Sequence, residues 1–379
     1  MKNLVKDLAK WKRISRGIAA LSLALTCYAN AAPAETPQAK HVFVVILENE
    51  GYSTTFGPNS AAPYLAKTLP RQGQLLTGYY GIGHNSNDNY LAMISGQAPN
   101  PQTQGDCQVF SDFESTGVFG PYGQLSGQGC VFPSSVETVA DQLALRGYTW
   151  HGYMESMPAA CSHPALNTVD NTQKATATSE YATRHNPFVY FHSLIDAPSC
   201  AANDVPLTAL RQDLESEETT PNLSYIVPNL CHDGHDSPCA DGEPGGLVSA
   251  NAWLKQYIPM ILNSPAYKKD GVLIVTFDEA DFGASGADAT ACCHELPGPN
   301  SPLPGITGPG GGRVGAVVLS PFVKPGSENG TPYNHYSLLK TVETLFSLPY
   351  LGYAQPSDVS PFGSDVFSKT GKKWGDQPH

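Results

Sequence analysis

The sequence predicts an α/β protein in which a mostly parallel sheet is sandwiched between helices. Short apolar runs rich in β-branched residues alternate along the chain with longer segments of helical periodicity. This alternation is typical of parallel sheets that are covered on both faces. The chain also contains 36 glycines and 32 prolines among its 379 residues, which favours a loop-rich enzyme over a helical bundle.

The first strand is expected at 41–47, where the run HVFVVIL has the composition of a strand buried on both faces. Five further runs have the same character, and helical patterns lie between them. The predicted strands are 41–47, 73–77, 148–153, 223–227, 271–277 and 314–319, and the predicted helices are 135–146, 246–263, 335–347 and a short one after Asn87. Two segments rich in turn residues, 100–134 and 280–312, are expected to be long loops.

Residues 1–34 have the pattern of a secretory signal peptide, with six lysines and arginines, an apolar stretch and then small residues. We therefore expect a secreted or periplasmic protein with a single folded domain over 35–379. The apolar stretch is too short for a transmembrane helix, no later run approaches that length, and Cys27 has a poor context for a lipid anchor. No stable membrane anchor is expected.

Eight of the nine cysteines follow this leader, and an even number in an exported chain indicates up to four disulfides. Short loops close at the lowest entropic cost. The pairs favoured for this reason are Cys107–Cys130, Cys161–Cys200 and Cys231–Cys239. Cys292 and Cys293 either form a vicinal disulfide or pair elsewhere, so long disulfide-tied loops are part of the expected fold.

The formal net charge of the chain is −12, and loss of the basic leader makes the remainder more acidic. A surface of that sign repels nucleic acid and anionic membranes, so neither is expected as a partner, and no protein partner is implied. A bound anion has to be held by local devices such as a metal ion, a helix N-terminus or histidines.

Polar clusters follow the predicted strands, where α/β sheets bind ligands. Glu48 and Asn49 follow the first strand, and Asp278 and Glu279 follow the strand at 271–277. Carboxylate and amide oxygens suit a hard or borderline cation. Each pair also has a structural explanation, which is turn capping for the first pair and an exposed position for the second.

Ser86 lies in the segment GHNSNDNYLAMISG, residues 83–96, just before or at the start of the short helix. Free amides and the helix dipole stabilise an anion there, whether an ionising hydroxyl or a bound phosphate. The same pattern fits a plain N-cap with Asn89 three positions further on. The local sequence leaves both interpretations open.

Four histidines are candidates for contact with a metal ion or a phosphate: His185, His232, His235 and His335. The dense run CHDGHD favours such a role for the second and third of them. The glycine-rich segment 308–313 lacks the Lys-Ser/Thr ending of a nucleotide-binding loop and precedes a strand. No serine lies in a G-x-S-x-G motif either, so neither a nucleotide-binding protein nor an α/β-hydrolase is expected.

Six motifs together resemble the phosphoesterase family that groups bacterial phospholipases C with acid phosphatases of the alkaline phosphatase superfamily. The resemblance extends from about His41 to Tyr353. The motifs are ILENEGYSTTFG, GHNSNDNYLAMISGQ, YATRHNPFVYF, IVPNLCHDGHD, TFDEAD and YNHYSLLKTVETLF.

The resemblance implies a phosphoester substrate and one divalent metal ion, with Zn, Ca and Mg all possible. The implied metal ligands are Glu48, Asn49, Ser86, Asp278 and Glu279. Ser86 is also the implied nucleophile, so a phosphoserine is the expected intermediate.

The remaining implied roles concern substrate binding and proton transfer. Asn89 is implied to hold the phosphoryl oxygens, and His185 with His232 or His235 to line the phosphate pocket. His335 matches a position of the family pattern, and His335 or His185 is the expected proton donor to the leaving group.

Two features depart from the family pattern. Asp88 stands where many relatives have proline, and its carboxylate either binds metal or biases substrate choice by repelling dianions. Alkaline phosphatases hold a second zinc with an aspartate and a histidine four residues later. Here that spacing is occupied by Asn229 and Asp233, or by Cys231 and His235, so a second metal is doubtful.

Hydrolysis of phosphate monoesters is the expected function, as in an acid phosphatase. A phospholipase C would use the same first step, but the acidic chain has no lipid-binding extension after the matched region. A catalytically silent secreted binding protein is the alternative from another class, and retention of Ser86, Asn89 and the acidic residues argues against it. A sulfatase is not expected, because Ser86 lacks the C/S-x-P-x-R context.

Overall fold

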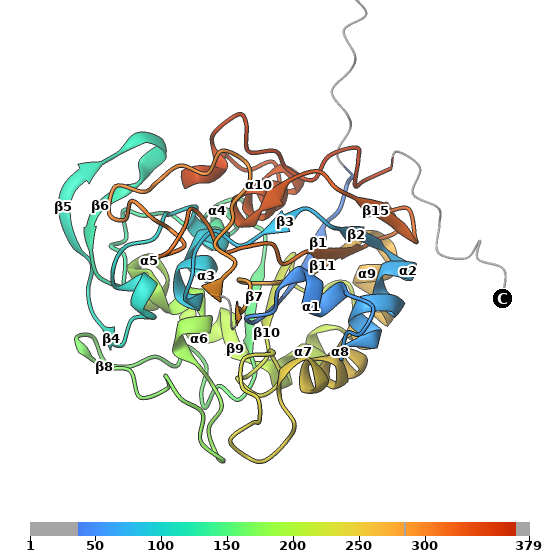
Figure 1. The fold of residues 1–379 in the computed structure, drawn as a ribbon. Coiled ribbons are helices and arrows are strands. Elements are labelled where there is room, and N and C mark those ends of the chain that lie inside the picture. Colours follow the sequence, from blue (N-terminus) through green and yellow to red (C-terminus); the bar gives the residue numbers. More distant parts are fainter. Residues whose placement is uncertain (1–36, 284–285, 369–379) are drawn as a thin grey trace, which may run out of the picture. The chain divides into compact units, whose positions relative to one another are not determined.

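The computed structural model of the protein describes residues 37–283 and 286–368, so the predicted signal peptide lies outside the described residues. Eight strands form the central sheet (Figure 1). In spatial order they are β15 (Ser327–Asn329), β2 (Gln74–Leu76), β14 (Ala316–Leu319), β11 (Gly271–Phe277), β1 (His41–Leu47), β10 (Leu223–Val227), β7 (Trp150–Met154) and β9 (Asp204–Pro206). Of these eight, β14 alone runs antiparallel to its neighbours.

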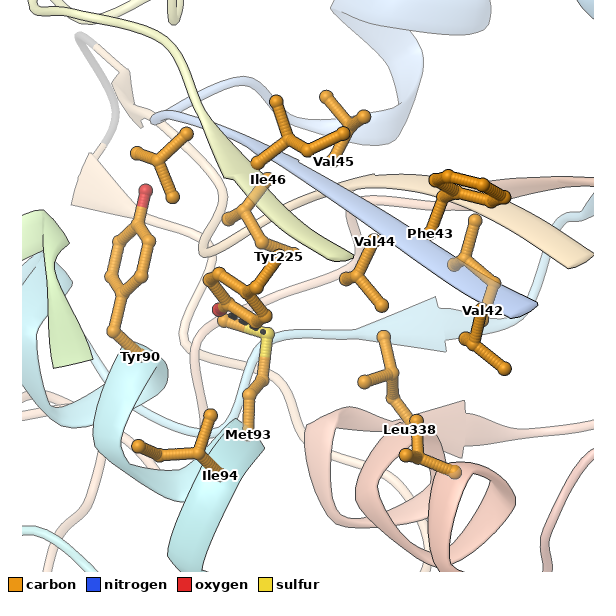
Figure 2. Packing of buried hydrophobic residues seen from close by; sticks show 14 of the residues in the cluster. Val42, Phe43, Val44, Val45, Ile46, Tyr90, Met93, Ile94, Tyr225 and Leu338 are labelled. Atoms are coloured by element: carbon orange, nitrogen blue, oxygen red, sulfur yellow. Dashed lines mark hydrogen bonds between the residues drawn. The ribbon is translucent and has the colours of Figure 1, made fainter. Parts of the chain in front are cut away.

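Strand β1 lies inside the sheet, and all seven of its residues are buried. Val44 pairs with Tyr225 of β10, and the Tyr225 hydroxyl donates to Met93 Sδ at 3.6 Å, on the side where Figure 2 shows α3 and α10. Phe43 points to the other face, where its ring lies 6.4 Å from that of Tyr267 in α9. Successive side chains of a strand alternate between faces, so an apolar run without alternation is buried on both, as predicted.

Helices cover both faces of this sheet. α3 and α10 pack together on one face, and α9 with the longer α8 covers the other. The α-helices are α1 (Tyr52–Phe56), α2 (Leu69–Gln72), α3 (Ser86–Ser95), α4 (Val139–Leu145), α5 (His192–Ile195), α6 (Cys200–Asn203), α7 (Leu210–Asp213), α8 (Gly246–Asn263), α9 (Pro265–Asp270) and α10 (His335–Leu345).

Most predicted elements are confirmed, with differences at their ends. β1, β10, β11 and α8 have the predicted bounds. Helix α4 begins later than predicted, because the Thr138 side chain accepts the Asp141 N–H while the Asp141 carboxylate accepts the Thr138 N–H, a capping box that fixes the first turn. The edge strands β9 and β15 were not predicted, because each has three residues and no apolar run.

Disulfides connect the loop segments as expected. The disulfides Cys107–Cys130, Cys161–Cys200 and Cys231–Cys239 are confirmed, and Cys292–Cys293 is a vicinal disulfide. Four two-stranded ribbons complete the fold: β3 (Tyr79–Tyr80) with β16 (Tyr333–Asn334), β4 (Val109–Phe110) with β8 (Thr168–Val169), β5 (Glu114–Phe119) with β6 (Leu125–Gln128), and β12 (Phe282–Gly283) with β13 (Gly286–Ala287). Within the described ranges, no helix has the length and apolar character needed to cross a bilayer.

Candidate active site

The carboxyl ends of β1 and β11 bring the two predicted acidic clusters together. The strands are parallel neighbours in register, so the residues that follow them meet at one edge of the sheet. Asp278 Oδ1 accepts the backbone N–H of Asn49 at 3.1 Å and that of Glu279 at 2.6 Å. Asn49 has a φ of +56°, a conformation that asparagine adopts more readily than most residues.

Ser86 is the first residue of α3 and faces this edge. Its hydroxyl donates to Glu48 Oε2 at 2.6 Å, and Asn49 Nδ2 donates to the same oxygen at 3.3 Å. The N-cap position belongs to Asn85, whose φ is +67°. The N-cap interpretation of Ser86 is therefore wrong, and its side chain is directed at the cluster of carboxylates.

A cavity of about 260 Å³ opens beside Ser86. Sequence reasoning singled out four of its lining residues and missed two. The lining consists of Asn49, Ser86, His235 and Glu279, which were predicted, and of Asn85 and Asp106, which were not.

The carboxylates of Glu48, Asp233 and Asp278 are buried, and their charged forms are disfavoured by burial. Burial, and then the charges of Asp278 and Asp233, raise the pKa of Glu48 well above its usual range. Burial likewise raises the pKa of Asp278 to about 6. Asp278 Oδ2 has no hydrogen-bond partner among the described residues. Glu48 Oε1 and Asp233 Oδ2 contact the ring nitrogens of His185, at 3.4 Å and 3.3 Å. Buried charges of one sign are stable only when a cation or protons compensate them, and carboxylate oxygens are ligands that suit a hard cation.

His84 is a site residue that sequence reasoning missed, although it stands two positions before Ser86 in a quoted motif. Its Nδ1 lies 2.5 Å from Glu279 Oε2, and its Nε2 lies 3.0 Å from the carbonyl oxygen of Asp288. Because a carbonyl only accepts, Nε2 carries the proton in the second contact. His84 therefore fixes the direction of the Glu279 carboxyl group at the cavity wall.

Asp233 was considered only as half of a possible second metal site, and the structure gives it a definite place. Its carbonyl accepts the Glu48 N–H at 2.8 Å, and its Oδ1 accepts the His235 N–H at 2.8 Å. Gly234 has a φ of +113°, and a Cβ there would lie 2.8 Å from the Glu48 carbonyl oxygen. Glycine is thus required for this loop to approach the end of β1.

The predicted histidines have different places in the structure. His185 is buried between carboxylates, with Nε2 at 3.4 Å from Glu48 Oε1 and Nδ1 at 3.3 Å from Asp233 Oδ2. Its ring stacks on Tyr90, and burial lowers its pKa well below the usual range. His232 is not part of the cavity lining and contacts Glu155 Oε2 at 3.0 Å. The cavity is lined instead by His235.

His335 and Asn89 form hydrogen bonds with groups outside the cavity. His335 Nε2 contacts the Asp278 carbonyl oxygen at 2.5 Å, and its Nδ1 contacts the Tyr79 hydroxyl at 3.0 Å. Burial lowers the pKa of His335 to about 4, so it is neutral at physiological pH. Asn89 Oδ1 accepts the N–H groups of Ile82 and Gly83, each at 3.0 Å. The geometry gives neither residue a contact with the cavity.

Asp88, the departure from the family pattern, also lies outside the cavity lining. It is 1% exposed, and a Cβ on Gly83 would stand 2.5 Å from its Oδ1. Burial, followed by repulsion from Asp106, raises its pKa well above the usual range. The structure therefore gives Asp88 no direct contact with a ligand in the cavity.

The fold and the family match together identify the class of protein to which the chain belongs. A protein of the alkaline phosphatase superfamily from Vibrio parahaemolyticus has a similar fold, with a TM-score of 0.50 and 13% sequence identity, over 86% of this chain and 72% of that chain. The predicted alkaline-phosphatase-like architecture is confirmed. The sequence model of the Phosphoesterase family matches residues 58–349, and the chain belongs to that family.

Curated relatives are named as phosphatases. The chain is 26% identical over 313 residues to a probable acid phosphatase of Kluyveromyces lactis, covering 83% of this chain and 59% of that protein. It is 25% identical to an acid phosphatase of Aspergillus fumigatus, covering 82% and 55%. It is also 25% identical to a phosphatidylinositol-3-phosphatase of Mycobacterium tuberculosis, covering 84% and 80%. The chain thus spans little more than half the length of these two fungal relatives.

Proposed function

We propose that the protein is an exported, metal-dependent phosphomonoesterase that works through a phosphoserine at Ser86. One observation carries this proposal: the Ser86 hydroxyl contacts Glu48 Oε2 at 2.6 Å, and Ser86 lines a cavity together with Asn49 and Glu279. Family membership and the phosphatase relatives support phosphoester chemistry. The four disulfides are consistent with export.

The residues that would hold the metal ion are Glu48, Asn49, Ser86, Asp278 and Glu279. All of them offer oxygen atoms, which favours a hard cation such as Ca²⁺ or Mg²⁺, although carboxylates also bind Zn²⁺. When bound, the ion would lower the pKa of the serine hydroxyl and neutralise charge on the phosphoryl oxygens.

The reaction then follows from the position of Ser86. Glu48 Oε2 accepts the hydroxyl hydrogen and orients Oγ. Oγ attacks phosphorus, the P–O bond to the alcohol breaks, and the alcohol takes up a proton as it leaves. A water molecule then attacks the phosphoserine, which restores the Ser86 hydroxyl and releases inorganic phosphate.

The proton donor to the leaving alcohol is not evident from the residues that line the cavity. The sequence assigns this role to His335 or His185, but both ring nitrogens of His335 are engaged by Asp278 and Tyr79. His185 is held between Glu48 and Asp233. Neither histidine lines the cavity, so these assignments stay predictions without support from the geometry.

Replacement of Ser86 by alanine tests the proposal. We expect kcat for p-nitrophenyl phosphate to fall by about three orders of magnitude or more, because the covalent route is lost. Ser95→Ala is the matched control, since Ser95 is buried at the other end of the same helix and its hydroxyl donates to the Leu91 carbonyl. Retention of most activity by Ser86→Ala would exclude Ser86 as the nucleophile.

Two measurements on the same preparation separate the alternatives. Hydrolysis of p-nitrophenyl phosphate but not phosphatidylcholine supports the phosphomonoesterase, and the reverse preference supports a phospholipase C. Elemental analysis of the purified protein tests the metal proposal. A protein with no bound metal and no turnover of any phosphoester would be the silent binding protein instead.

A further inference from the structure

Asp106 lies at the N-terminus of α3, in the wall of the cavity beside Ser86. It follows a short 3₁₀ turn, Thr103–Gly105, and its Oδ1 accepts the backbone N–H of Asn87 at 3.0 Å. Asn87 is the second residue of the ten-residue helix α3. The free amides and the dipole at such a terminus attract anions. One of these amides is therefore already bonded to a carboxylate that lines the cavity beside Ser86.

Arg184 is a buried cation that joins two residues of the cavity wall. Its Nε lies 3.8 Å from Asp106 Oδ2, and its Nη2 lies 3.2 Å from His235 Nε2. Its Nη1 also donates to the carbonyl of Gln173 at 3.2 Å. The side chain is 3% exposed, so its charge is poorly screened by solvent.

The contact with Arg184 also orients the ring of His235. A guanidinium can only donate, so His235 Nε2 accepts and carries no proton. Its Nδ1 lies 2.7 Å from Asp236 Oδ1 and donates there. Arg184 and Asp236 thus hold the His235 ring in one orientation at the cavity wall.

We propose that Asp106 and Arg184 form an opposed charge pair that sets the affinity of the cavity for the phosphoryl group. Asp106 competes with phosphoryl oxygens for the Asn87 amide and repels multiply charged phosphate. Arg184 offsets that repulsion and fixes His235 and Asp106 in position. Asp106 thus weakens the binding of phosphate dianions, substrate and product alike, without excluding them. This inference rests on the proposed phosphoesterase function, whose site it describes.

The two variants are expected to act in opposite directions. Asp106→Asn keeps an oxygen for the Asn87 amide but removes the charge, so the inhibition constant for orthophosphate and the KM for p-nitrophenyl phosphate should each fall about 3- to 10-fold. This range is a discounted Coulomb effect for a partly screened charge a few ångströms from the ligand. Arg184→Gln should raise both constants about 10-fold or more. Arg184→Lys keeps the charge but not the planar fork, and should lie between.

The double variant tests whether the two residues act as a pair. Because the lost charges have opposite signs, Asp106→Asn with Arg184→Gln should return the inhibition constant to within about threefold of wild type. Glu215→Gln and Arg211→Gln are matched controls, since both residues are exposed, outside the cavity lining. Isothermal titration with orthophosphate measures affinity without turnover, and melting curves establish that each variant folds.

Two outcomes would overturn the inference. Unchanged or weaker orthophosphate binding by Asp106→Asn would show that its carboxylate does not oppose the ligand. A hundredfold fall in kcat with an unchanged KM would make Asp106 a proton donor instead. Ser86→Ala is assayed in parallel: its turnover tests the proposed function, whereas orthophosphate affinity in the Asp106 and Arg184 variants tests only the charge pair.

Discussion

Replacement of Asp278 by asparagine should stabilise the metal-free protein at neutral pH. Burial raises the pKa of this carboxyl group from 3.8 to about 6. The folded state therefore opposes ionisation, and its stability falls as the pH rises from about 4 to about 6. A shift of about two pKa units corresponds to about 3 kcal/mol. Asparagine keeps the oxygen that accepts the Asn49 and Glu279 N–H groups, so it removes the charge and leaves these contacts.

Urea unfolding in the presence of a chelator measures this effect. At pH 7.5 the free energy of unfolding of Asp278→Asn should exceed that of wild type by up to about 3 kcal/mol, and below pH 4 the two should agree. A saturating divalent cation should remove most of this difference, because binding to the folded state at about 100 times Kd adds about 2.7 kcal/mol, mainly to wild type. Asp241→Asn, at an exposed aspartate, is the control. A chelated variant less stable than wild type at pH 7.5 would refute the reasoning.

Two further predictions concern histidines that the sequence placed in the site. His335→Gln should cost about 1–3 kcal/mol in unfolding free energy, because the Asp278 carbonyl and the Tyr79 hydroxyl lose their buried partner. Loss of the alkaline limb of the pH–rate profile would instead identify His335 as a proton donor. His232→Gln should lower stability more at pH 5 than at pH 9, because the hydrogen bond to Glu155 raises the pKa of His232 and that stabilisation is lost as the pH rises through the raised value. Equal losses in urea unfolding at both pH values would contradict this, and a raised KM would favour the substrate contact that the sequence predicts.

The fold could be predicted because its strands carry strong local signals. β1 and β11 are continuous apolar runs, and a strand buried on both faces has this pattern wherever it lies in the chain. The direction of β14 could not be predicted in the same way, because apolar composition is the same for parallel and antiparallel strands. Short edge strands such as β9 have too few residues to produce a periodic signal.

The meeting of the two acidic clusters could also be predicted, because Glu48 and Asp278 directly follow β1 and β11, which are neighbours in the sheet. Residues on loops were harder. His232 and His235 are three positions apart in one dense motif, and the turn at Gly234 decides which of them faces the cavity. Arg184 was missed for a similar reason, since it stands beside His185 in a quoted motif and its role depends on a contact with a distant loop.

Asp106 is a carboxylate that lines the cavity, whereas the sequence directs attention to Asp88. Asp88 belongs to α3, and its side chain packs against Gly83 outside the cavity lining. Asp106 comes from the loop that the Cys107–Cys130 disulfide ties down, and it reaches the Asn87 amide from outside the helix. We therefore assign to Asp106 the repulsion of dianions that the sequence attributes to Asp88. Asp106 lies on a separate loop and contacts the N-terminus of α3. A helix N-terminus attracts any anion, so the proposed role of a fixed carboxylate at that point is to make the site discriminate by charge.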